Sequence, residues 1–237
     1  MRRITRLPYA AVVPTPLPLF PLNTPLVPGL VLPLHIFEPR YRGLVEELLE
    51  LPDEDEREFG IVAVRDGREV ARDGMAALYP VGTATVLRQV ERLDDGSYDI
   101  VTTGSRRFRI VDVDDREPLL RGGVEFLDDV SDPADQLLAG PVAARFRAYR
   151  AALSGQIVAP DDADEDDDLP EDPTVLSYLV TAAMVLPTEE RQLLLSASST
   201  AERLTLARSA LGRETALISS LSAVPALDIP GVAPSVN

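Results

Sequence analysis

The sequence predicts an α+β protein with a β-rich first half and a helical second half. Up to about residue 127, short apolar runs recur at roughly ten-residue spacing between glycine-containing turns, which is typical of a small barrel or sandwich. From residue 132 onward, apolar residues recur at helical spacing behind helix-start signals. Strands that precede helices, rather than alternate with them, indicate segregated layers.

The β-rich half carries several strand-like runs and one helix. Asp66-Gly67 and Asp95-Gly96 suit two-residue type I′ hairpin turns, and Gly104 is expected to separate two strands. Glu38-Pro39 opens the helix, because proline is tolerated at the first helical position, and Pro52 ends it. The strands are expected at residues 59–64, 81–90, 97–102, 107–113 and 119–127.

The helical half begins at Asp132-Pro133, and its first helix is expected to reach about Leu153. Gly140-Pro141 is a candidate kink within this helix. Its expected apolar side consists of Leu137, Leu138, Phe146, Tyr149 and Leu153.

Further helices are expected after the first. Asp172-Pro173 repeats the start signal, and Pro187 ends the helix that it opens. A short helix is expected at residues 189–195. Ser199 and Glu202 form a capping box for the last helix, because each side chain can satisfy an amide donor at a helix start.

The expected organisation has four parts: a flexible N-terminal segment (1–16), a β-rich subdomain (17–128), a helical subdomain (129–222) with an acidic linker (154–172), and a loose tail (223–237). Residues 161–172 contribute nine carboxylates to a net charge of −16. A calcium loop would need glycine at the sixth position of this run, which is Asp166. We therefore expect a solvated, self-repelling linker.

The composition excludes several kinds of chemistry. All 23 basic residues are arginines, there is no cysteine, and His35 is the single histidine. A P-loop ATPase, a Schiff base and a Ser–Lys dyad each need a lysine. Thiol nucleophiles, disulfides and thiolate zinc sites need cysteine, and one histidine cannot build a multi-histidine metal site. We expect no cofactor and no metal, which leaves carboxylate chemistry, chemistry through His35, or no chemistry at all.

The compartment is expected to be the cytoplasm, without membrane association. Arginines precede an apolar stretch near the N-terminus, but prolines interrupt that stretch and no clean cleavage site follows it. No window approaches the roughly 18 apolar residues that a membrane span requires. The negative net charge disfavours nucleic acid as a partner, because affinity for phosphate backbones needs a basic surface. The basic run 106–109 is expected to be alternating surface charge.

The polar residues near position 35 are candidates for chemistry. His35 could act as a general base, but no nucleophile motif such as GxSxG accompanies it, so we expect it to fix a strand-to-helix corner by hydrogen bonds. Glu38 could be half of an acid/base pair, but it lies where a helix-capping acid belongs. Arg40 and Arg42 are expected to pair with local acids.

Residues 25–33, PLVPGLVLP, form an apolar segment rich in proline. Most of it is expected to be buried, with Gly29 at a turn, because hydrophobic strands usually face a core. An exposed apolar rim would instead contact other polypeptides. The candidate contacts with a bound polypeptide are Leu26, Val27, Leu30 and Phe37.

Residues 17–42, LPLFPLNTPLVPGLVLPLHIFEPRYR, resemble the opening of the substrate-binding N-terminal domain of Lon proteases. The similarity continues through FGIVAV, VGTATVL, DGSYDIVTTGSRRFRI and LPEDPTVLSYLV, and it covers about residues 17–221. PLHIFEPRYR is the specific piece. Its residues, for which structural roles are expected, are Pro33, Leu34, His35, Ile36, Phe37, Glu38, Pro39, Arg40 and Tyr41.

The resemblance implies a PUA-like β pseudobarrel followed by a small helical lobe. It also implies a stand-alone substrate-binding-domain protein, without ATPase and peptidase domains, that recognises unfolded or damaged polypeptides. We therefore expect a non-catalytic polypeptide-binding module, with a quality-control adaptor role and a protease partner as further hypotheses. The alternatives are a hydrolase that uses carboxylates or His35, and an RNA-binding PUA-like protein, which the net charge disfavours.

Overall fold

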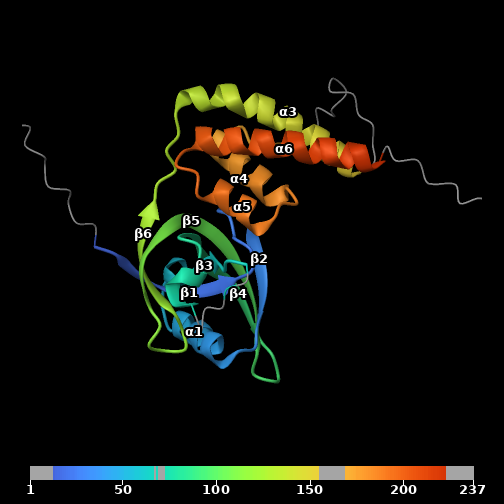
Figure 1. The fold of residues 1–237 in the computed structure, drawn as a ribbon. Helices are drawn as coiled ribbons and strands as arrows, with labels where there is room; N and C mark the ends of the chain where they lie inside the picture. Colours follow the sequence, from blue (N-terminus) through green and yellow to red (C-terminus); the bar gives the residue numbers. More distant parts are fainter. Residues whose placement is uncertain (1–12, 67, 69–72, 155–168, 223–237) are drawn as a thin grey trace, which may run out of the picture.

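The structure, a computed structural model, describes residues 13–66, 68, 73–154 and 169–222. A β-rich lobe is followed by a helical lobe that stacks on one end of it (Figure 1). The fold is therefore α+β with segregated layers, as the sequence predicts. Most of the expected acidic linker, the tail at 223–237 and residues 1–12 of the expected N-terminal segment lie outside the described residues.

The described sheet has six strands in the order β2-β5-β4-β3-β1-β6. An additional pairing between β5 and β6 closes β5, β4, β3, β1 and β6 into a pseudobarrel, and β2 continues the sheet beyond β5. The elements of this lobe are β1 (Thr15–Leu22), β2 (Val31–Ile36), α1 (Pro39–Leu49), η1 (Glu54–Glu56), β3 (Glu58–Ala63), η2 (Gly74–Ala77), β4 (Val81–Arg92), β5 (Tyr98–Asp114) and β6 (Arg121–Leu127).

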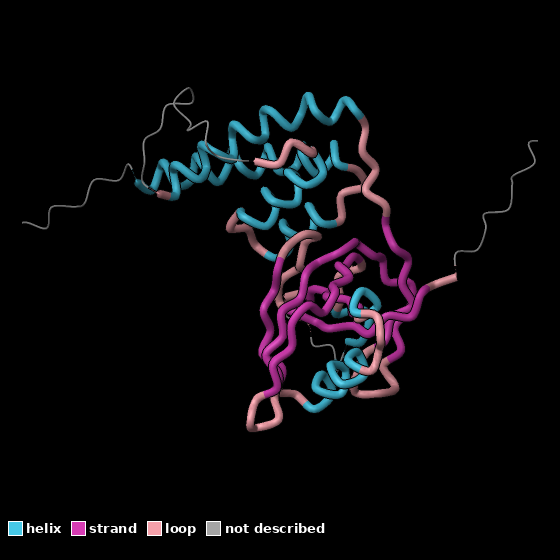
Figure 2. Tube along the Cα trace, turned by 180° about the vertical axis from the view of Figure 1, so that it is seen from behind, coloured by secondary structure: helices cyan, strands magenta, loops and turns pink. Residues whose placement is uncertain are grey.

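Helix α1 packs against one end of the pseudobarrel (Figure 2). Its buried face consists of Tyr41, Leu44, Val45 and Leu48, which recur at helical spacing. These side chains share a core with Phe20, Ile36 and other barrel residues. Phe20 and Tyr41 lie with ring centroids 4.1 Å apart. The PLHIFEPRY motif thus forms the end of β2 and the start of α1.

Strand β1 was not expected, and the predicted start of the β-rich subdomain at residue 17 falls inside it. Three prolines, Pro16, Pro18 and Pro21, argue against a strand because proline cannot donate to a ladder. The strand forms because its remaining groups pair on both sides, antiparallel to β6 and parallel to β3. The amide of Leu19, for example, donates to the carbonyl of Leu120 at 2.8 Å.

Strand β5 is continuous through Gly104, so the prediction of two strands at 97–102 and 107–113 was wrong. Gly104 is needed for a close approach rather than for a turn. Its amide donates to the carbonyl of Leu30 at 2.9 Å, and a side chain here would place a Cβ 2.6 Å from the carbonyl oxygen of Val27. The loop before β2 can therefore lie directly against β5.

The hairpin between β4 and β5 is confirmed at Asp95-Gly96, but it is not a two-residue type I′ turn. Type I′ needs a positive φ at both central residues, and here only Gly96 has one, at +82°. The amide of Leu93 donates to the carbonyl of Ser97 at 2.9 Å across a three-residue loop. At Asp66-Gly67, Gly67 lies outside the described residues, and the next strand begins only at Val81.

The elements of the helical lobe are η3 (Pro133–Asp135), α3 (Gln136–Leu153), α4 (Pro173–Ala183), α5 (Thr188–Leu195) and α6 (Thr200–Ser222). The long helices α3 and α6 lie side by side, and α4 and α5 lie between them and the pseudobarrel (Figure 1). The expected buried side of α3 was partly wrong. Leu137 and Leu153 are exposed, because Ala139, Val142, Phe146 and Tyr149 form the face that meets the lobe's core.

The predicted helix starts are largely confirmed. The Asp172 carboxylate accepts from the amides of Thr174 (2.7 Å) and Val175 (3.0 Å) and so caps α4. At α6 only half of the capping box forms as expected. The amide of Glu202 donates to the Ser199 hydroxyl, but the Glu202 carboxylate accepts from the amide of Ser198 instead of that of Ser199.

Replacing Gly104 with alanine should destabilise the protein by about 1–3 kcal/mol, because the new methyl group overlaps a backbone carbonyl that cannot easily move. Urea denaturation measures the change. Gly43→Ala is the matched control: Gly43 lies inside α1 with open space around it, so alanine should stabilise by about 0.5–1 kcal/mol. Equal free energies of unfolding for the two variants would contradict the close approach at Gly104.

Candidate functional site

The two lobes meet through a small apolar cluster and several polar contacts. Val27 and Val81 of the β-rich lobe pack against Tyr178 and Leu195 of the helical lobe, and all are buried. The side-chain amide of Gln192 donates to the carbonyl of Val81 at 2.8 Å. The lobes are therefore joined by packing as well as by the chain that links them.

Arg107 lies in this interface, so the prediction of surface charge for residues 106–109 was wrong at this position. Its side chain is only 2% exposed, and its Nη1 donates to the carbonyls of Leu195 (2.9 Å) and Ala197 (2.6 Å). The physical reason is that the helical lobe covers this part of β5, because the two carbonyls that accept from Arg107 belong to that lobe. Arg107 and Phe108 pair with Thr83 and Gly82 in regular register and so point to opposite faces, Phe108 into the barrel core and Arg107 toward the helical lobe, and both are buried.

Three side chains at this junction donate hydrogen bonds to a single carboxylate oxygen. Asp129 Oδ1 accepts hydrogen bonds from Arg107 Nη2 (2.9 Å), Arg203 Nη2 (2.9 Å) and the Tyr178 hydroxyl (2.6 Å). Arg203 is fully buried and lies 3.9 Å over the Tyr178 ring. Burial raises the pKa of Tyr178, which therefore remains a neutral donor to the carboxylate. We call these four residues the Asp129 cluster.

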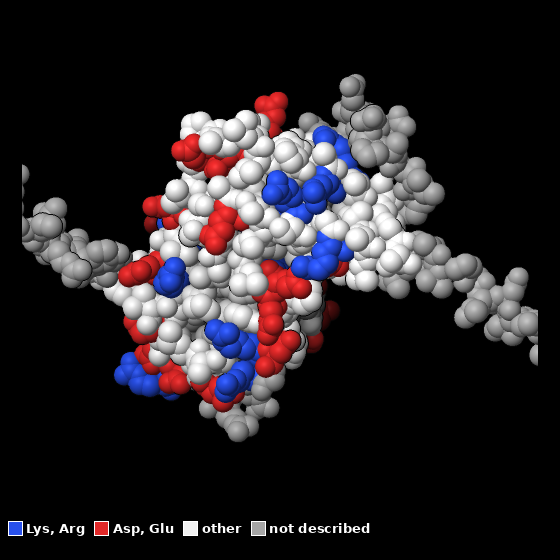
Figure 3. All heavy atoms as spheres, turned by 45° about the horizontal axis from the view of Figure 1, so that its top comes forward, with Lys and Arg blue, Asp and Glu red and all other residues white. Residues whose placement is uncertain are grey.

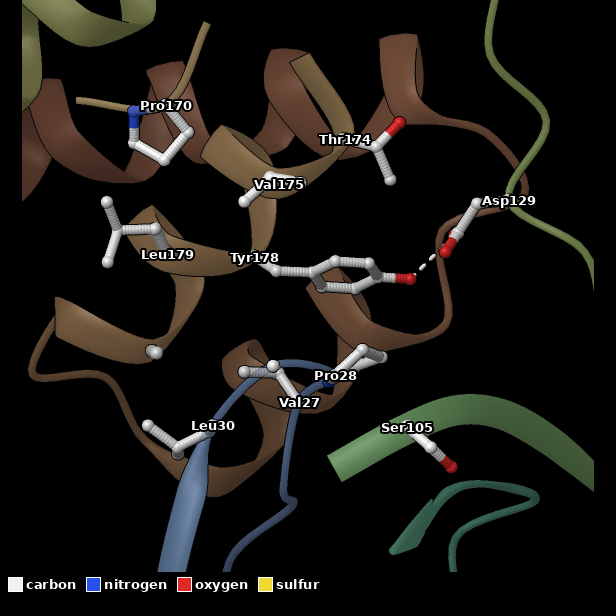
Figure 4. Close-up of a pocket in the computed structure, with 12 residues that line it drawn as sticks. Val27, Pro28, Leu30, Ser105, Asp129, Pro170, Thr174, Val175, Tyr178 and Leu179 are labelled. Carbon is white, nitrogen blue, oxygen red and sulfur yellow. Dashed lines mark hydrogen bonds between the residues drawn. The ribbon is translucent and has the colours of Figure 1, made fainter. Parts of the chain in front are cut away.

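Beside the Asp129 cluster lies an open groove of about 360 Å³ (Figure 4). One wall is the loop before β2, residues 27–30, and the other is α4. Asp129 and Ser105 contribute polar atoms, whereas the remaining surface is mainly apolar. Leu30 (38%), Val175 (52%) and Leu179 (38%) are partly exposed to solvent along it. We call this feature the interlobe groove.

The four predicted polypeptide contacts differ in exposure and in location. Leu26 and Val27 are 3% and 1% exposed and so do not offer exposed side chains as predicted, although Val27 is among the residues that line the interlobe groove. Leu26 packs in the core that α1 shares with the barrel, Val27 packs in the cluster between the lobes, and the Thr83 hydroxyl donates to the carbonyl of Leu26 at 2.6 Å. Leu30 lines the interlobe groove, beyond Gly29, whose φ of +83° confirms the expected turn. Phe37 is 66% exposed but lies at the other end of β2, beside α1.

His35 pairs with a carboxylate. Its Nδ1 lies 2.7 Å from Asp99 Oδ1, and the two residues are cross-strand partners in β2 and β5, each about half exposed. The hollow around this pair is lined by aliphatic residues, Gln89 and Glu91, without a serine or threonine among the described residues that line it. The pair therefore lacks the adjacent hydroxyl that a triad requires.

The charged residues after His35 stabilise the local structure. Glu38 occupies the N-cap position of α1, but its side chain makes no capping hydrogen bond and instead pairs with Arg40 at 2.8 Å. Arg40 also lies 4.6 Å over the Tyr41 ring. Arg42 was expected to pair with an acid, whereas it donates to the carbonyl of Gly96 at 3.3 Å. None of these contacts assembles an acid/base pair.

The described residues contain no group of three or more histidine, cysteine, aspartate or glutamate side chains placed to hold a metal ion. Within the same part of the chain, no helix combines the length and apolar character needed to cross a bilayer. On the face shown in Figure 3, arginines and acidic residues are interspersed rather than gathered by sign.

Comparison with known proteins identifies the family. The protein-family model for the ATP-dependent protease La (LON) substrate-binding domain matches residues 16–213 of this chain. This chain belongs to the Lon substrate-binding domain family. Lon protease of Anaeromyxobacter dehalogenans is 26% identical over 87% of this chain, and Lon protease 2 of Myxococcus xanthus is 25% identical over the same share. The chain spans about a quarter of the length of these proteases, 24% in each case.

Solved structures of the family share the fold. The Lon N-terminal domain protein from Xanthomonas campestris superposes with a TM-score of 0.56 at 24% identity and covers 81% of this chain and 95% of its own. The N-terminal domain of the Mycobacterium avium complex Lon protease gives 0.60 at 17% identity, covering 84% and 98%. The PUA-like pseudobarrel with a helical lobe, which the resemblance implied, is confirmed.

The wall of the interlobe groove on α4 was missed in the sequence. Helical spacing alone places Leu176, Leu179, Val180 and Ala183 on one face of this helix, which would be expected to be buried as a whole. The structure buries Leu176 and Val180 in the lobe's core but leaves Val175 and Leu179 at the groove. The available signal was that VLSYLV is apolar on more than one side of the helix, which indicates a second apolar contact.

Replacing Asp129 with asparagine should lower the free energy of unfolding by about 3 kcal/mol, because Arg107 and Arg203 would stay buried without a compensating carboxylate. Urea denaturation measures this loss. Asp128→Asn removes an exposed charge one position away and should change the free energy by no more than about 0.5 kcal/mol. A loss that is equally small for both variants would show that the cluster does not hold the lobes together.

Proposed function

We propose that this chain binds extended apolar segments of unfolded or damaged polypeptides in the interlobe groove, without catalysing a reaction on them. The observation that carries this proposal is the partial exposure of Leu30, Val175 and Leu179 along one open groove. Apolar side chains exposed together in a concave surface are typical of binding sites for apolar ligands. Membership of a substrate-binding domain family supports a polypeptide as that ligand.

The energetics of the groove suit transient capture. Burying one aliphatic side chain of a client contributes about 1.5–3 kcal/mol, and ordering the client's backbone offsets part of that gain. A groove of about 360 Å³ holds only a few such side chains. Affinities near the micromolar range follow, since about −8 kcal/mol corresponds to 1 μM. Contacts of this kind select for exposed apolar character rather than for one particular sequence.

Charge adds a second level of selection. The chain carries a net charge of −16, so its electrostatic field repels strongly acidic segments and attracts cationic ones. Salt screens this field beyond about one Debye length. The same field opposes RNA as a ligand, because binding to a phosphate backbone depends on neutralisation by basic residues. Clients with apolar anchors and flanking basic residues are therefore favoured.

A quality-control adaptor role in the cytoplasm extends the proposal. The Lon proteases that resemble this chain are about four times as long as the part matched here. These 237 residues include no lysine, so neither a P-loop nor a Ser–Lys dyad can be formed from them. Hydrolysis of ATP or of a captured client would depend on residues outside this sequence, such as those of a protease partner.

Leu179→Asp tests the proposed site. A carboxylate on the α4 wall should weaken the capture of a reduced and carboxamidomethylated model protein roughly 10- to 100-fold, because it removes an apolar contact of about 1.5–3 kcal/mol. Fluorescence anisotropy at low salt measures the affinity, and circular dichroism checks the fold. Leu137→Asp is the matched control, since Leu137 is 79% exposed on α3, away from the groove.

Two results would contradict the proposal. If the unchanged protein captures no unfolded chain at micromolar concentration, polypeptide binding is wrong. If Leu179→Asp and Leu137→Asp weaken capture equally, the polypeptide binds elsewhere on the molecule.

A further inference from the structure

Strand β2 has one paired side and one free side. Among the described strands it pairs only with β5, antiparallel, with Val31 opposite Thr103 and Ile36 opposite Tyr98. It runs from the interlobe groove at Leu30 to α1, along the right-hand side of the pseudobarrel in Figure 1. An edge strand of this kind presents unpaired main-chain groups that can accept another strand.

The register shows which residues face the free side. The carbonyl of Leu30 accepts a hydrogen bond from the amide of Gly104 at 2.9 Å, so this main-chain group is directed toward β5. Main-chain direction alternates along a strand, so residues 32, 34 and 36 also face β5, and Val31, Pro33 and His35 face outward. Pro33 has no amide hydrogen, and because it faces the free side, no hydrogen bond between β2 and β5 is lost.

The side-chain contact at His35 supports this register. In antiparallel sheets, opposite residues that exchange no main-chain hydrogen bonds have their side chains closest together. His35 and Asp99 are such opposite residues, and their side chains meet at 2.7 Å. The amide and carbonyl of His35 are therefore directed away from β5.

The outer surface of β2 is apolar as well as unpaired. Val31 is 56% exposed and Phe37 is 66% exposed, and the Phe37 ring stacks beside His35 with centroids 6.1 Å apart. Natural edge strands are usually protected by lysines, charges or bulges. Here Pro33 and the half-exposed His35 are the only residues of β2 with that effect. Beyond the end of β2, a hollow of about 310 Å³ lies between Leu34–Phe37 and residues Phe20–Leu22 of β1.

We propose that the free edge of β2 binds an extended segment of the client polypeptide by strand addition, so that one client chain runs from the interlobe groove along β2 to Phe37. This inference rests on the proposed function, because it assigns a second contact to the same client. Main-chain hydrogen bonds to Val31, Pro33 and His35 would recognise any extended sequence, and the groove would select for apolar side chains.

The two surfaces are continuous, which supports a single client. Leu30 lines the interlobe groove, and the next residue, Val31, begins β2. The six residues of β2 extend about 20 Å at 3.3 Å per residue. An extended segment of six or seven residues therefore spans the distance from the groove to Phe37, where the hollow of about 310 Å³ offers space for one further side chain.

A second copy of this chain fits the edge less well than a client does. Two β2 strands paired antiparallel through their outward-facing residues, which are centred on Pro33, would bring Pro33 opposite Pro33, and neither residue has an amide to donate. A client without proline at that position supplies its own amide to the Pro33 carbonyl. The asymmetric pairing thus keeps more of the hydrogen bonds than the symmetric one.

Residue-specific amide exchange of the unchanged protein tests the inference. The probe is a seven-residue peptide of alternating valine and threonine with blocked ends, and exchange is followed by NMR. We expect the amides of Val31 and His35 to slow at least tenfold when the peptide is bound, because they gain partners. The amides of Leu32 and Leu34, already paired with β5, should change little. Binding without protection of Val31 and His35 would overturn the inference.

A pair of variants at one position separates the main chain from the side chain. His35→Pro removes the outward amide, whereas His35→Ala removes only the imidazole and its contact with Asp99. His35→Pro should weaken peptide binding about three- to tenfold, the effect of one hydrogen bond, and His35→Ala should stay within about twofold of the unchanged protein. Equal affinities of the two variants would count against strand addition.

The outcomes distinguish this inference from the proposed function. If peptide binding is weakened by Leu179→Asp but not by His35→Pro, the interlobe groove binds clients and the edge of β2 does not. If the peptide does not bind but the reduced and carboxamidomethylated protein does, the inference fails alone, and if neither binds, the proposed function fails together with the inference. Should His35→Pro unfold, the exchange experiment on the unchanged protein still decides.

Discussion

The arrangement of the two lobes depends on one carboxylate shared by two buried arginines. Asp129 lies between β6 and the helical lobe, and it binds Arg107 of β5, Arg203 of α6 and Tyr178 of α4 through a single oxygen. An arginine that is fully buried must be paired, because removing it from water costs several kcal/mol. The barrel and the helices can therefore separate only by exposing both cations, and this constraint fixes α4 beside the loop at residues 27–30.

The interlobe groove is a consequence of that constraint, because neither lobe contains it alone. Leu30 comes from the loop that Gly104 allows to lie against β5, and Val175 and Leu179 come from a helix whose opposite side is packed in the core. At the polar end of the groove, Asp129 Oδ1 already accepts three hydrogen bonds, two of them from arginines that balance its charge. What the groove offers is mainly apolar surface, which is why a binding role fits better than a catalytic one.

Local signals in the sequence were sufficient for the parts of the fold that local interactions determine. The starts of α1 and α4 and the hairpin at Gly96 depend on residues a few positions apart, and these were predicted. The burial of Arg107 depends on carbonyls about 90 positions away, so alternation along β5 alone could not predict that the helical lobe covers its outward face. Of the candidate contacts, Leu30 could be predicted from its apolar segment, whereas Leu179 becomes part of the site only when α4 is placed against another lobe.

The most direct test of the account is to map a bound client on the isotopically labelled protein by NMR. Titration with a reduced and carboxamidomethylated model protein should shift the backbone resonances of residues 27–31 and 174–182 together, on both walls of the groove, at micromolar to submillimolar client. Resonances along the outer sides of α3 and α6 should stay in place. Shifts confined to α3 and α6, or no shifts over that range of concentration, would contradict the claim that the interlobe groove binds unfolded polypeptides.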